Sequence, residues 1–306
     1  MTELQNGSLF DTIVTLVAVH FVDGDVFFLG IAALITASVV KIFFRKTARF
    51  PLSRLGIFAG VILVGLSSTP LPLWFYCLWG IAILGALFDR KNNLEVLSIR
   101  KNLVSIILIV LSLIAAMAEL PYHMQPSIPI GHANKIIVIG DSISAGIGNE
   151  SELWPAILQS EIGIRVINIS EPGLKVAGAA EKAGRLEDTA SESKVIILEI
   201  GGNDILGKTE IKTFEMNLDR IFDFVSRRAN TIIVLELPLP PFCNRYGRIQ
   251  RRLAKKYGAH MIPKRYFAGV ITSPEATVDG LHLSPIGHQM FAEMICENLT
   301  SLGSPK

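Results

Sequence analysis

The sequence predicts an α/β fold in which helices cover both faces of a parallel five-stranded sheet, preceded by an α-helical transmembrane bundle. Two observations lead to this prediction. Long apolar runs fill the first 120 of the 306 residues, and short β-branched runs separated by helical stretches fill the remainder. Half of the chain is hydrophobic and only 18% is charged, which is unusual for a soluble protein and indicates a membrane portion.

Four apolar runs in succession predict the transmembrane bundle. A spanning helix needs roughly 17–25 residues, so the shorter runs must include flanking residues to cross a membrane. Four such runs leave too few polar residues to cover them as core helices of a soluble domain. A further stretch, residues 9–22, carries Asp11 and His20, and it either spans the membrane or lies along the interface. The four runs are residues 26–44, 55–69, 71–88 and 103–118.

The positions of the basic residues predict the orientation of these spans. Basic residues fall between the first and second runs and between the third and fourth, so both loops are expected to be cytoplasmic. The other side holds Asp23, Asp25 and the uncharged loop "SSTPLP". We therefore expect a multi-pass protein of a bacterial inner membrane whose C-terminal domain is extracytoplasmic. The basic residues are Lys41, Arg45, Lys46, Arg49, Arg54, Arg90, Lys91, Arg100 and Lys101.

The composition changes near residue 120. Pro121, Pro126 and Pro129 cannot continue a helix and predict an extended linker. The expected organisation is a transmembrane region at 1–120, a linker at 121–133 and a soluble domain at 134–306. Residues 131–306 hold 20 basic and 20 acidic side chains, so charge gives no support for a nucleic-acid partner. Within the membrane region, the spacing of Gly56 and Gly60 allows close helix packing, either inside the bundle or in a dimer.

Five β-branched runs predict the strands of the soluble domain. Continuous apolar strands separated by helices are typical of a parallel sheet that is covered on both faces. In such sheets, ligands bind outside the carboxyl ends of the strands, so the residues that follow each strand are candidates for chemistry. The runs are residues 136–139, 166–169, 195–200, 231–235 and the weaker 260–262.

Small polar segments follow the first three of these strands: Gly140-Asp141-Ser142, "NISEPG" at 168–173 and "GGND" at 201–204. A phosphate-binding loop of the Walker type needs GxxxxGK[ST], and no lysine follows Gly146 or Gly148. The dinucleotide pattern GxGxxG is also absent. Serine chemistry is the alternative, because a nucleophilic serine needs a base, a group that orients the base, and donors for the oxyanion.

The C-terminal stretch "VDGLHLSPIGH" supplies candidates for the base and its orienting group. Asp279 and His282 are three residues apart, so one turn can bring carboxylate and imidazole together. With Ser142 they would form a triad. His288 could extend Asp279 and His282 into a metal site, but the chain has no Cys/His cluster with ligand spacing, and a structural histidine is the simpler interpretation. No metal or other cofactor is expected.

These segments together resemble the SGNH hydrolases, also called the GDSL esterase/lipase family, and within it the small bacterial lysophospholipase and acyl-thioesterase group. The resemblance covers about residues 134–302 and includes four blocks in order: "GDSIS", the glycine of "NISEPG", "GGND" and "DGLH". It implies a three-layer α/β/α, flavodoxin-like sheet. The N-terminal membrane region departs from the small secreted members. A GxSxG elbow is disfavoured, because Ser144 stands where that pattern has its second glycine.

The resemblance assigns roles to particular residues. Ser142 would be the nucleophile, His282 the base and then the acid, and Asp279 the group that orients the imidazole. The backbone N–H groups of Ser142 and Gly173 and the side-chain amide of Asn203 would form the oxyanion hole. For Asp141 and Asp204 we expect capping or local hydrogen bonds rather than chemistry.

The expected function is therefore that of a membrane-anchored serine ester hydrolase that acts on lipid or envelope esters. Its substrate would be a small-molecule or lipid ester. Two alternatives remain open: an O-acyltransferase or O-acetylesterase acting on envelope glycans, and a catalytically inactive, membrane-tethered binding module. Acyl-chain length and oligomeric state do not follow from the sequence. Cys243 and Cys296 could pair in an oxidising compartment, although two cysteines alone establish no disulfide framework.

Overall fold

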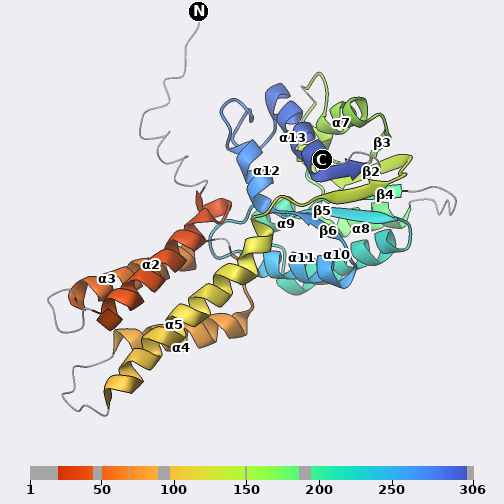
Figure 1. The fold of residues 1–306 in the computed structure, drawn as a ribbon. Helices are drawn as coiled ribbons and strands as arrows, with labels where there is room; N and C mark the ends of the chain where they lie inside the picture. The colour runs from red at the N-terminus through yellow and green to blue at the C-terminus, as the bar shows by residue number, and fades with distance from the viewer. Residues whose placement is uncertain are drawn as a thin grey trace, which may run out of the picture. The chain divides into compact units, whose positions relative to one another are not determined.

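A computed structural model describes residues 20–43, 50–67, 69–88, 97–148, 150–185 and 194–301. The described residues divide into two compact units (Figure 1). A helical unit consists of residues 20–123 together with 240–244, and an α/β unit consists of residues 124–239 and 245 onward. The sequence predicts an interfacial or fifth spanning segment at residues 9–22. Residues 9–19 of it lie outside the described part of the chain, and residues 20–22 are helical.

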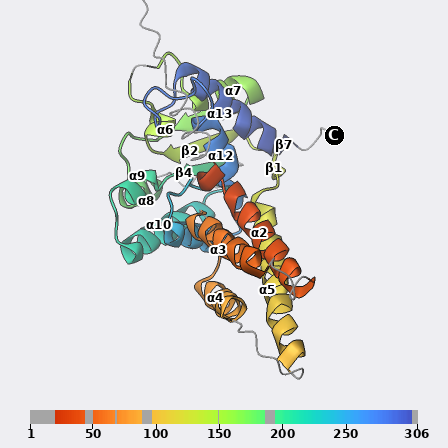
Figure 2. The same ribbon diagram turned by 90° about the vertical axis from the view of Figure 1, so that its left-hand side faces the viewer.

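Each of the four apolar runs forms a helix in the helical unit. The helices are α2 (Asp25–Phe43), α3 (Phe50–Leu66), α4 (Leu73–Leu87) and α5 (Leu97–Glu119), followed by the short 3₁₀ helix η1 (Leu120–Tyr122). Helix α2 packs against both α3 and α5, and α4 packs against α5 (Figure 2). Among the residues that the structure describes, two segments, Asp25–Phe43 and Asn102–Tyr122, are long and apolar enough to cross a membrane, and the apolar parts of α3 and α4 are shorter.

Small residues let α2 and α3 approach each other closely. A Cβ atom placed on Gly60 would lie 2.9 Å from the Gly30 carbonyl oxygen, and one on Gly56 would lie 3.0 Å from Ala37 Cβ. Both contacts are tighter than side chains normally allow. Of the two interpretations of the GxxxG spacing, packing inside the bundle is therefore the one that the structure shows.

The α/β unit contains a parallel five-stranded sheet in the order β3-β2-β4-β5-β6. This is the flavodoxin-like strand order, and the five strands coincide with the five predicted runs. The long apolar side chains of β4 are buried along its whole length, as expected for a strand that is covered on both faces. The strands are β2 (Lys135–Gly140), β3 (Arg165–Asn168), β4 (Lys194–Glu199), β5 (Thr231–Leu235) and β6 (His260–Ile262).

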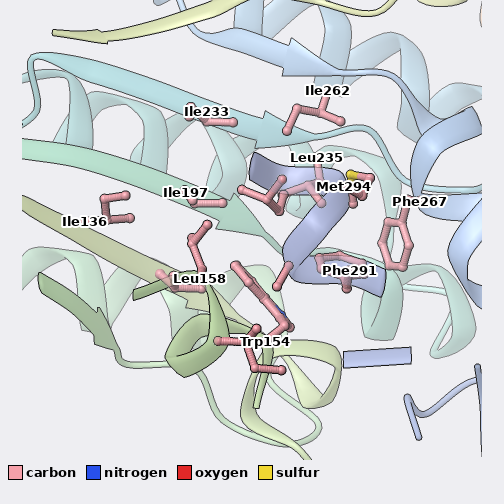
Figure 3. Packing of buried hydrophobic residues seen from close by; sticks show 14 of the residues in the cluster. Ile136, Trp154, Leu158, Ile197, Ile233, Leu235, Ile262, Phe267, Phe291 and Met294 are labelled. Atoms are coloured by element: carbon pink, nitrogen blue, oxygen red, sulfur yellow. The ribbon is translucent and has the colours of Figure 1, made fainter. Parts of the chain in front are cut away.

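Helices cover both faces of this sheet (Figure 1). Against one face, Trp154, Phe267 and Phe291 pack on alternate strand residues such as Ile136 and Ile197 (Figure 3). The intervening strand residues point to the opposite face, because successive side chains of a strand alternate. The first face is covered by α7 (Trp154–Ile162), α12 (Lys264–Ile271) and α13 (Pro285–Asn298), and the second by α8 (Val176–Gly184), α10 (Ile211–Ser226) and α11 (Asn244–Lys256).

A second, two-stranded sheet was not predicted. Strand β1 (Ile128–Gly131) lies in the segment expected to be a linker and pairs in parallel with β7 (Leu299–Ser301). Ile128 and Ile130 are buried in the same apolar cluster as the main sheet. The prolines do exclude a helix here, but the extended backbone forms part of the α/β unit, which begins at Met124.

Helix α13 begins where the chain packs tightly, and this allows a matched pair of substitutions. A Cβ atom on Gly287 would overlap the Ala276 carbonyl oxygen, whereas one on Gly269, inside α12, would meet no atom within 4 Å. Gly287→Ala is expected to destabilise the fold by about 1–3 kcal/mol or more through overpacking. Gly269→Ala should instead stabilise it by about 0.5–1 kcal/mol, because alanine favours the helix. Thermal unfolding of both variants measures this, and equal melting temperatures would contradict the close contact.

Candidate active site

Ser142 begins a one-turn helix directly after strand β2, which lies between β3 and β4 in the sheet. This helix, α6 (Ser142–Ala145), is capped by Asp141, whose Oδ1 accepts the backbone N–H of Ile143 at 3.1 Å. Asp141 therefore has the capping role that the sequence predicts. Ser142 is 9% exposed, so it lies just below the surface, at the carboxyl edge of the sheet.

Asn203 lies beside this turn. It belongs to α9 (Gly202–Leu206), which follows the neighbouring strand β4. Its side-chain nitrogen donates to Asp141 Oδ2 at 3.1 Å and to the Leu174 carbonyl oxygen at 3.2 Å. Asp141 thus has a second role beyond the cap, since one carboxylate oxygen holds the helix and the other holds the amide of Asn203. Both hydrogens of that amide have protein acceptors.

Gly173 supplies a backbone N–H after strand β3. Its φ of +75° lies in the left-handed region, which favours glycine, and a Cβ atom there would meet nothing within 4 Å. Within the described residues, no protein acceptor takes the N–H of Gly173 or that of Ser142. Two of the three predicted oxyanion donors are therefore not used by the protein itself.

Asp279 and His282 form a hydrogen-bonded pair in the loop between α12 and α13. The Asp279 Oδ2 atom lies 2.6 Å from Nδ1 of His282, while Oδ1 accepts the backbone N–H groups of Leu281 at 3.0 Å and His282 at 2.8 Å. The hydrogen bonds to the His282 ring and to these N–H groups lower the pKa of Asp279 to about 2. The carboxylate is thus ionised at neutral pH and fixes the orientation of the imidazole.

The carboxyl group of Asp141 has a raised pKa. Burial raises this pKa to about 6, while the hydrogen bond from the N–H of Ile143 and the nearby His282 lower it. His282 thus contributes to the electrostatics of the residue that precedes Ser142. In the described part of the chain, no hydrogen bond joins Ser142 Oγ to His282. The structure thus brings Asp279 to His282, and Asn203 to the Ser142 turn.

The sequence did not reveal a buried carboxyl group beneath the turn that carries Ser142. Glu199 ends strand β4, is fully buried, and its Oε2 accepts the hydroxyl of Ser144 at 2.8 Å and the backbone N–H of Asp141 at 3.2 Å. Burial and the neighbouring Asp141 raise the pKa of Glu199 well above its usual value. The signal in the sequence was a single acidic residue inside the apolar run "VIILEI". Glu199 anchors the turn that carries Ser142.

Two other polar residues have structural roles. The ring of His288 is buried, and its Nδ1 accepts the backbone N–H of Trp154 at 3.2 Å, so it is a structural histidine as predicted. Asp204 Oδ2 accepts the N–H of Val176 at 2.8 Å at the start of α8. This hydrogen bond is structural, as expected, but it caps a helix 28 positions earlier in the chain rather than being local. The three cysteines, Cys77, Cys243 and Cys296, are free thiols.

Comparison with known proteins identifies a family. The model of the GDSL-like lipase/acylhydrolase family matches residues 138–290, which is half of the chain. No curated protein matches the chain. Among solved structures, TesA is 25% identical with a TM-score of 0.48, covering 54% of this chain and 97% of its own. Esterase EstA from Pseudoalteromonas sp. is 20% identical with a TM-score of 0.49, and the match covers 54% of this chain and 96% of the esterase. The acetylxylan esterase Axe2 from Geobacillus stearothermophilus is 20% identical with a TM-score of 0.46, and the match covers 57% of this chain and 96% of Axe2.

Proposed function

The chain belongs to the GDSL-like lipase/acylhydrolase family, and from this premise we propose that it is a membrane-anchored serine ester hydrolase. It acts through an acyl-enzyme on lipid or cell-envelope esters. The observation that carries the proposal is the 2.6 Å contact between Asp279 and His282, in a chain whose Ser142 begins the helical turn after β2. A nucleophile, a base and an orienting carboxylate are the groups that acyl transfer to serine requires.

In the proposed reaction, the Ser142 hydroxyl oxygen attacks the acyl carbon while its proton passes to Nε2 of His282. Asp279 holds the proton on Nδ1 and stabilises the imidazolium that forms. Collapse of the tetrahedral intermediate breaks the ester bond, and His282 returns the proton to the leaving alcohol. Water then attacks the acyl-enzyme by the same route in reverse order, which releases the acid and restores the serine.

The oxyanion of the tetrahedral intermediate needs preorganised donors. The N–H groups of Ser142 and Gly173 are not taken by protein acceptors in the described residues. The Asn203 amide is oriented by Asp141, and its second hydrogen is held by the Leu174 carbonyl oxygen. We propose that the oxyanion replaces the Leu174 carbonyl as the acceptor, so that Asp141 keeps the amide in place while the acceptor changes.

Asn203→Ala tests this donor. We expect kcat to fall about 10²- to 10³-fold with little change in KM, because the oxyanion is present only in the transition state and the intermediate. Asn203→Asp is nearly isosteric but replaces the donors with acceptors, and it should lose at least as much. Steady-state rates on a p-nitrophenyl ester provide the measurement. Activity of Asn203→Asp near the wild-type level would exclude Asn203 as an oxyanion donor.

Exposed apolar side chains on the helical unit support the proposed anchoring. The side chains of Leu29, Phe58, Ile81 and Met117 lie on four different helices and are 58–72% exposed. Such extensive apolar exposure is rare on a soluble monomer, while it is what lipid-facing helices require. The basic residues of the two loops predicted from the sequence would hold those loops on the cytoplasmic side. The α/β unit would then be extracytoplasmic.

The test of the activity uses the full-length protein in detergent. It is given p-nitrophenyl esters of short and long acyl chains, acyl-CoA and lysophospholipid, and the products are followed by absorbance and mass spectrometry. Hydrolysis, together with fluorophosphonate labelling of Ser142, is the expected result. Absence of both would favour the binding-module alternative. Transfer to a sugar acceptor that is faster than hydrolysis would favour an acyltransferase.

Anchoring and orientation are tested separately in cells. The protein should remain in the membrane fraction after carbonate extraction. An alkaline phosphatase reporter fused to the C-terminus, which is active only outside the cytoplasm, should be active. A reporter that is active only when cytoplasmic would overturn the orientation while leaving the proposed chemistry intact.

A further inference from the structure

We propose that His20, Asp23 and Asp25 bind a single divalent metal ion, best matched by Zn²⁺, at one end of the helical unit. In the described part of the chain, these are the residues whose nitrogen and carboxylate oxygen atoms converge as a set of possible metal ligands, all within 4.8 Å of one another. The site lies in the helical unit and does not depend on the proposed esterase activity. It is also distinct from the possible metal site at Asp279, His282 and His288 that the sequence analysis considered.

The distances within the cluster suit a metal better than hydrogen bonds. Nδ1 of His20 lies 3.6 Å from Asp23 Oδ2 and 3.5 Å from Asp25 Oδ2. Hydrogen bonds between nitrogen and oxygen are usually about 2.7–3.2 Å long, so both separations exceed that range. A tetrahedral zinc ion with ligand bonds of about 2.0–2.1 Å holds its donor atoms about 3.3–3.4 Å apart. The two distances from His20 are thus close to that separation, and all three donor atoms lie within 4.8 Å of one another.

The backbone at the start of α2 brings the three side chains to one place. His20 lies in a helical segment that ends at residue 22, and Gly24, with φ of +94°, forms the bend before α2 begins at Asp25. Asp23 Oδ1 accepts the backbone N–H of Asp25 at 2.8 Å, which fixes the carboxylate and turns Oδ2 toward His20. The capping contact and the ligand position thus use different oxygens of the same carboxylate.

His123, about 100 positions later in the sequence, lies beside the cluster. Its Nδ1 lies 3.7 Å from Asp25 Oδ1, the oxygen that does not face His20. The side chain of His123 is only 6% exposed, and its ring packs edge-on against Phe28 at 4.7 Å between centroids. Groups that contact the free oxygen of a ligating carboxylate orient it and tune metal affinity. We therefore assign His123 the role of a positioning residue for Asp25.

The chemistry of the donors selects the metal. An imidazole nitrogen favours zinc and later transition metals over Mg²⁺ and Ca²⁺, which prefer oxygen ligands alone. Two carboxylates held this close repel each other, and a dication would offset that repulsion. Three protein ligands leave one tetrahedral position for a water molecule. The side chains of His20 and Asp25 are 51% and 43% exposed, so an ion can enter from solvent.

Zinc titration of the full-length protein tests the proposal. The detergent-solubilised protein, carrying no polyhistidine tag and stripped with EDTA, is titrated with Zn²⁺ by calorimetry and followed by thermal unfolding. We expect one tight equivalent of zinc and a melting temperature that rises with zinc concentration. X-ray absorption at the zinc edge should show nitrogen and oxygen ligands. His20→Gln and Asp25→Asn should each weaken binding by about 100-fold or more, and His123→Ala by about 10- to 100-fold.

Matched controls make the outcome decisive. His132→Ala removes an exposed histidine outside the cluster and should bind zinc as the wild type does. If Asp25→Asn fails to fold, His20→Gln still tests the site, because the His20 side chain is half-exposed. Equal zinc affinity in the wild type and His20→Gln would show that the cluster is only a helix cap with ion pairs. Tighter binding of Mg²⁺ or Ca²⁺ than of Zn²⁺ would refute the assignment of the metal.

Discussion

Replacing Ser142 with alanine is expected to lower kcat for ester hydrolysis by about four to six orders of magnitude, with no loss of folded protein. The substitution removes the proposed nucleophile, so no acyl-enzyme can form. Its structural cost should be small, because the Ser142 hydroxyl takes part in no hydrogen bond within the described residues. Initial rates on a p-nitrophenyl ester and labelling by a fluorophosphonate measure the loss, and thermal unfolding confirms the fold.

Ser151→Ala is the matched control, since Ser151 is an exposed serine in the loop before α7. It should keep wild-type rates and wild-type labelling. Fluorophosphonate labelling that persists in Ser142→Ala would place the nucleophile elsewhere. A variant that is both inactive and unfolded would show instead that Ser142 has a structural role that its contacts do not indicate.

Asp279→Asn is expected to lower kcat by about 10⁴-fold, with a much smaller effect on KM. Asparagine can still accept the backbone N–H groups of Leu281 and His282, so the loop should keep its shape. It cannot stabilise the imidazolium, and its amide group favours the wrong tautomer of His282. The measurement is the pH dependence of kcat and kcat/KM for the variant and the wild type.

The lowered pKa of Asp279 also predicts which pH range depends on this carboxyl group. The pKa is about 2 in the folded protein and near 4 in an unfolded chain, so the carboxylate is ionised in both states at neutral pH. Any contribution of the Asp279–His282 pair to stability is present above about pH 4 and is lost as the pH falls toward 2. The low-pH limb of the wild-type rate profile should therefore not arise from Asp279.

Asp223→Asn is the control for removing a surface carboxylate. Asp223 lies on α10 and pairs with Arg227 one helical turn later, at 2.6 Å. An exposed pair of this kind contributes little to stability, so activity and melting temperature should both stay near wild type. If Asp279→Asn behaved like Asp223→Asn, the pair with His282 would have no catalytic importance.

The main sheet could be predicted strand by strand because its signal is local. Runs such as those at 136–139 and 195–200 are continuous, β-branched and bounded by glycine, so each strand can be recognised without its neighbours. The pairing of β1 with β7 could not be predicted, because it joins two segments of three or four residues about 170 positions apart. Pro129 inside β1 also argued against a strand, and prolines are tolerated chiefly where a strand edge is free.

The same distinction between local and distant contacts applies to the candidate site. Asp279 and His282 are three residues apart, so their contact followed from one turn of chain. The support that Glu199 gives to Ser144 depends on two neighbouring strands ending at the same level, and no pattern within either strand encodes it. The proposed metal site shows the point again. The proposed ligands His20 and Asp25 are close in sequence, whereas His123, the proposed positioning residue, comes about 100 positions later.

The pairing of β1 with β7 has a mechanical consequence. The chain passes from the helical unit into the α/β unit at residues 123–124, and β1 is the first strand that it enters. The pairs Ile128–Leu299 and Pro129–Thr300 are therefore the first strand contacts that the chain makes after residue 123. The five-stranded sheet that carries Ser142 begins only at Lys135, after this pairing. If the helical unit is anchored in a membrane as proposed, a force transmitted along residues 120–127 would load the β1–β7 pair before it loads the strand that precedes Ser142.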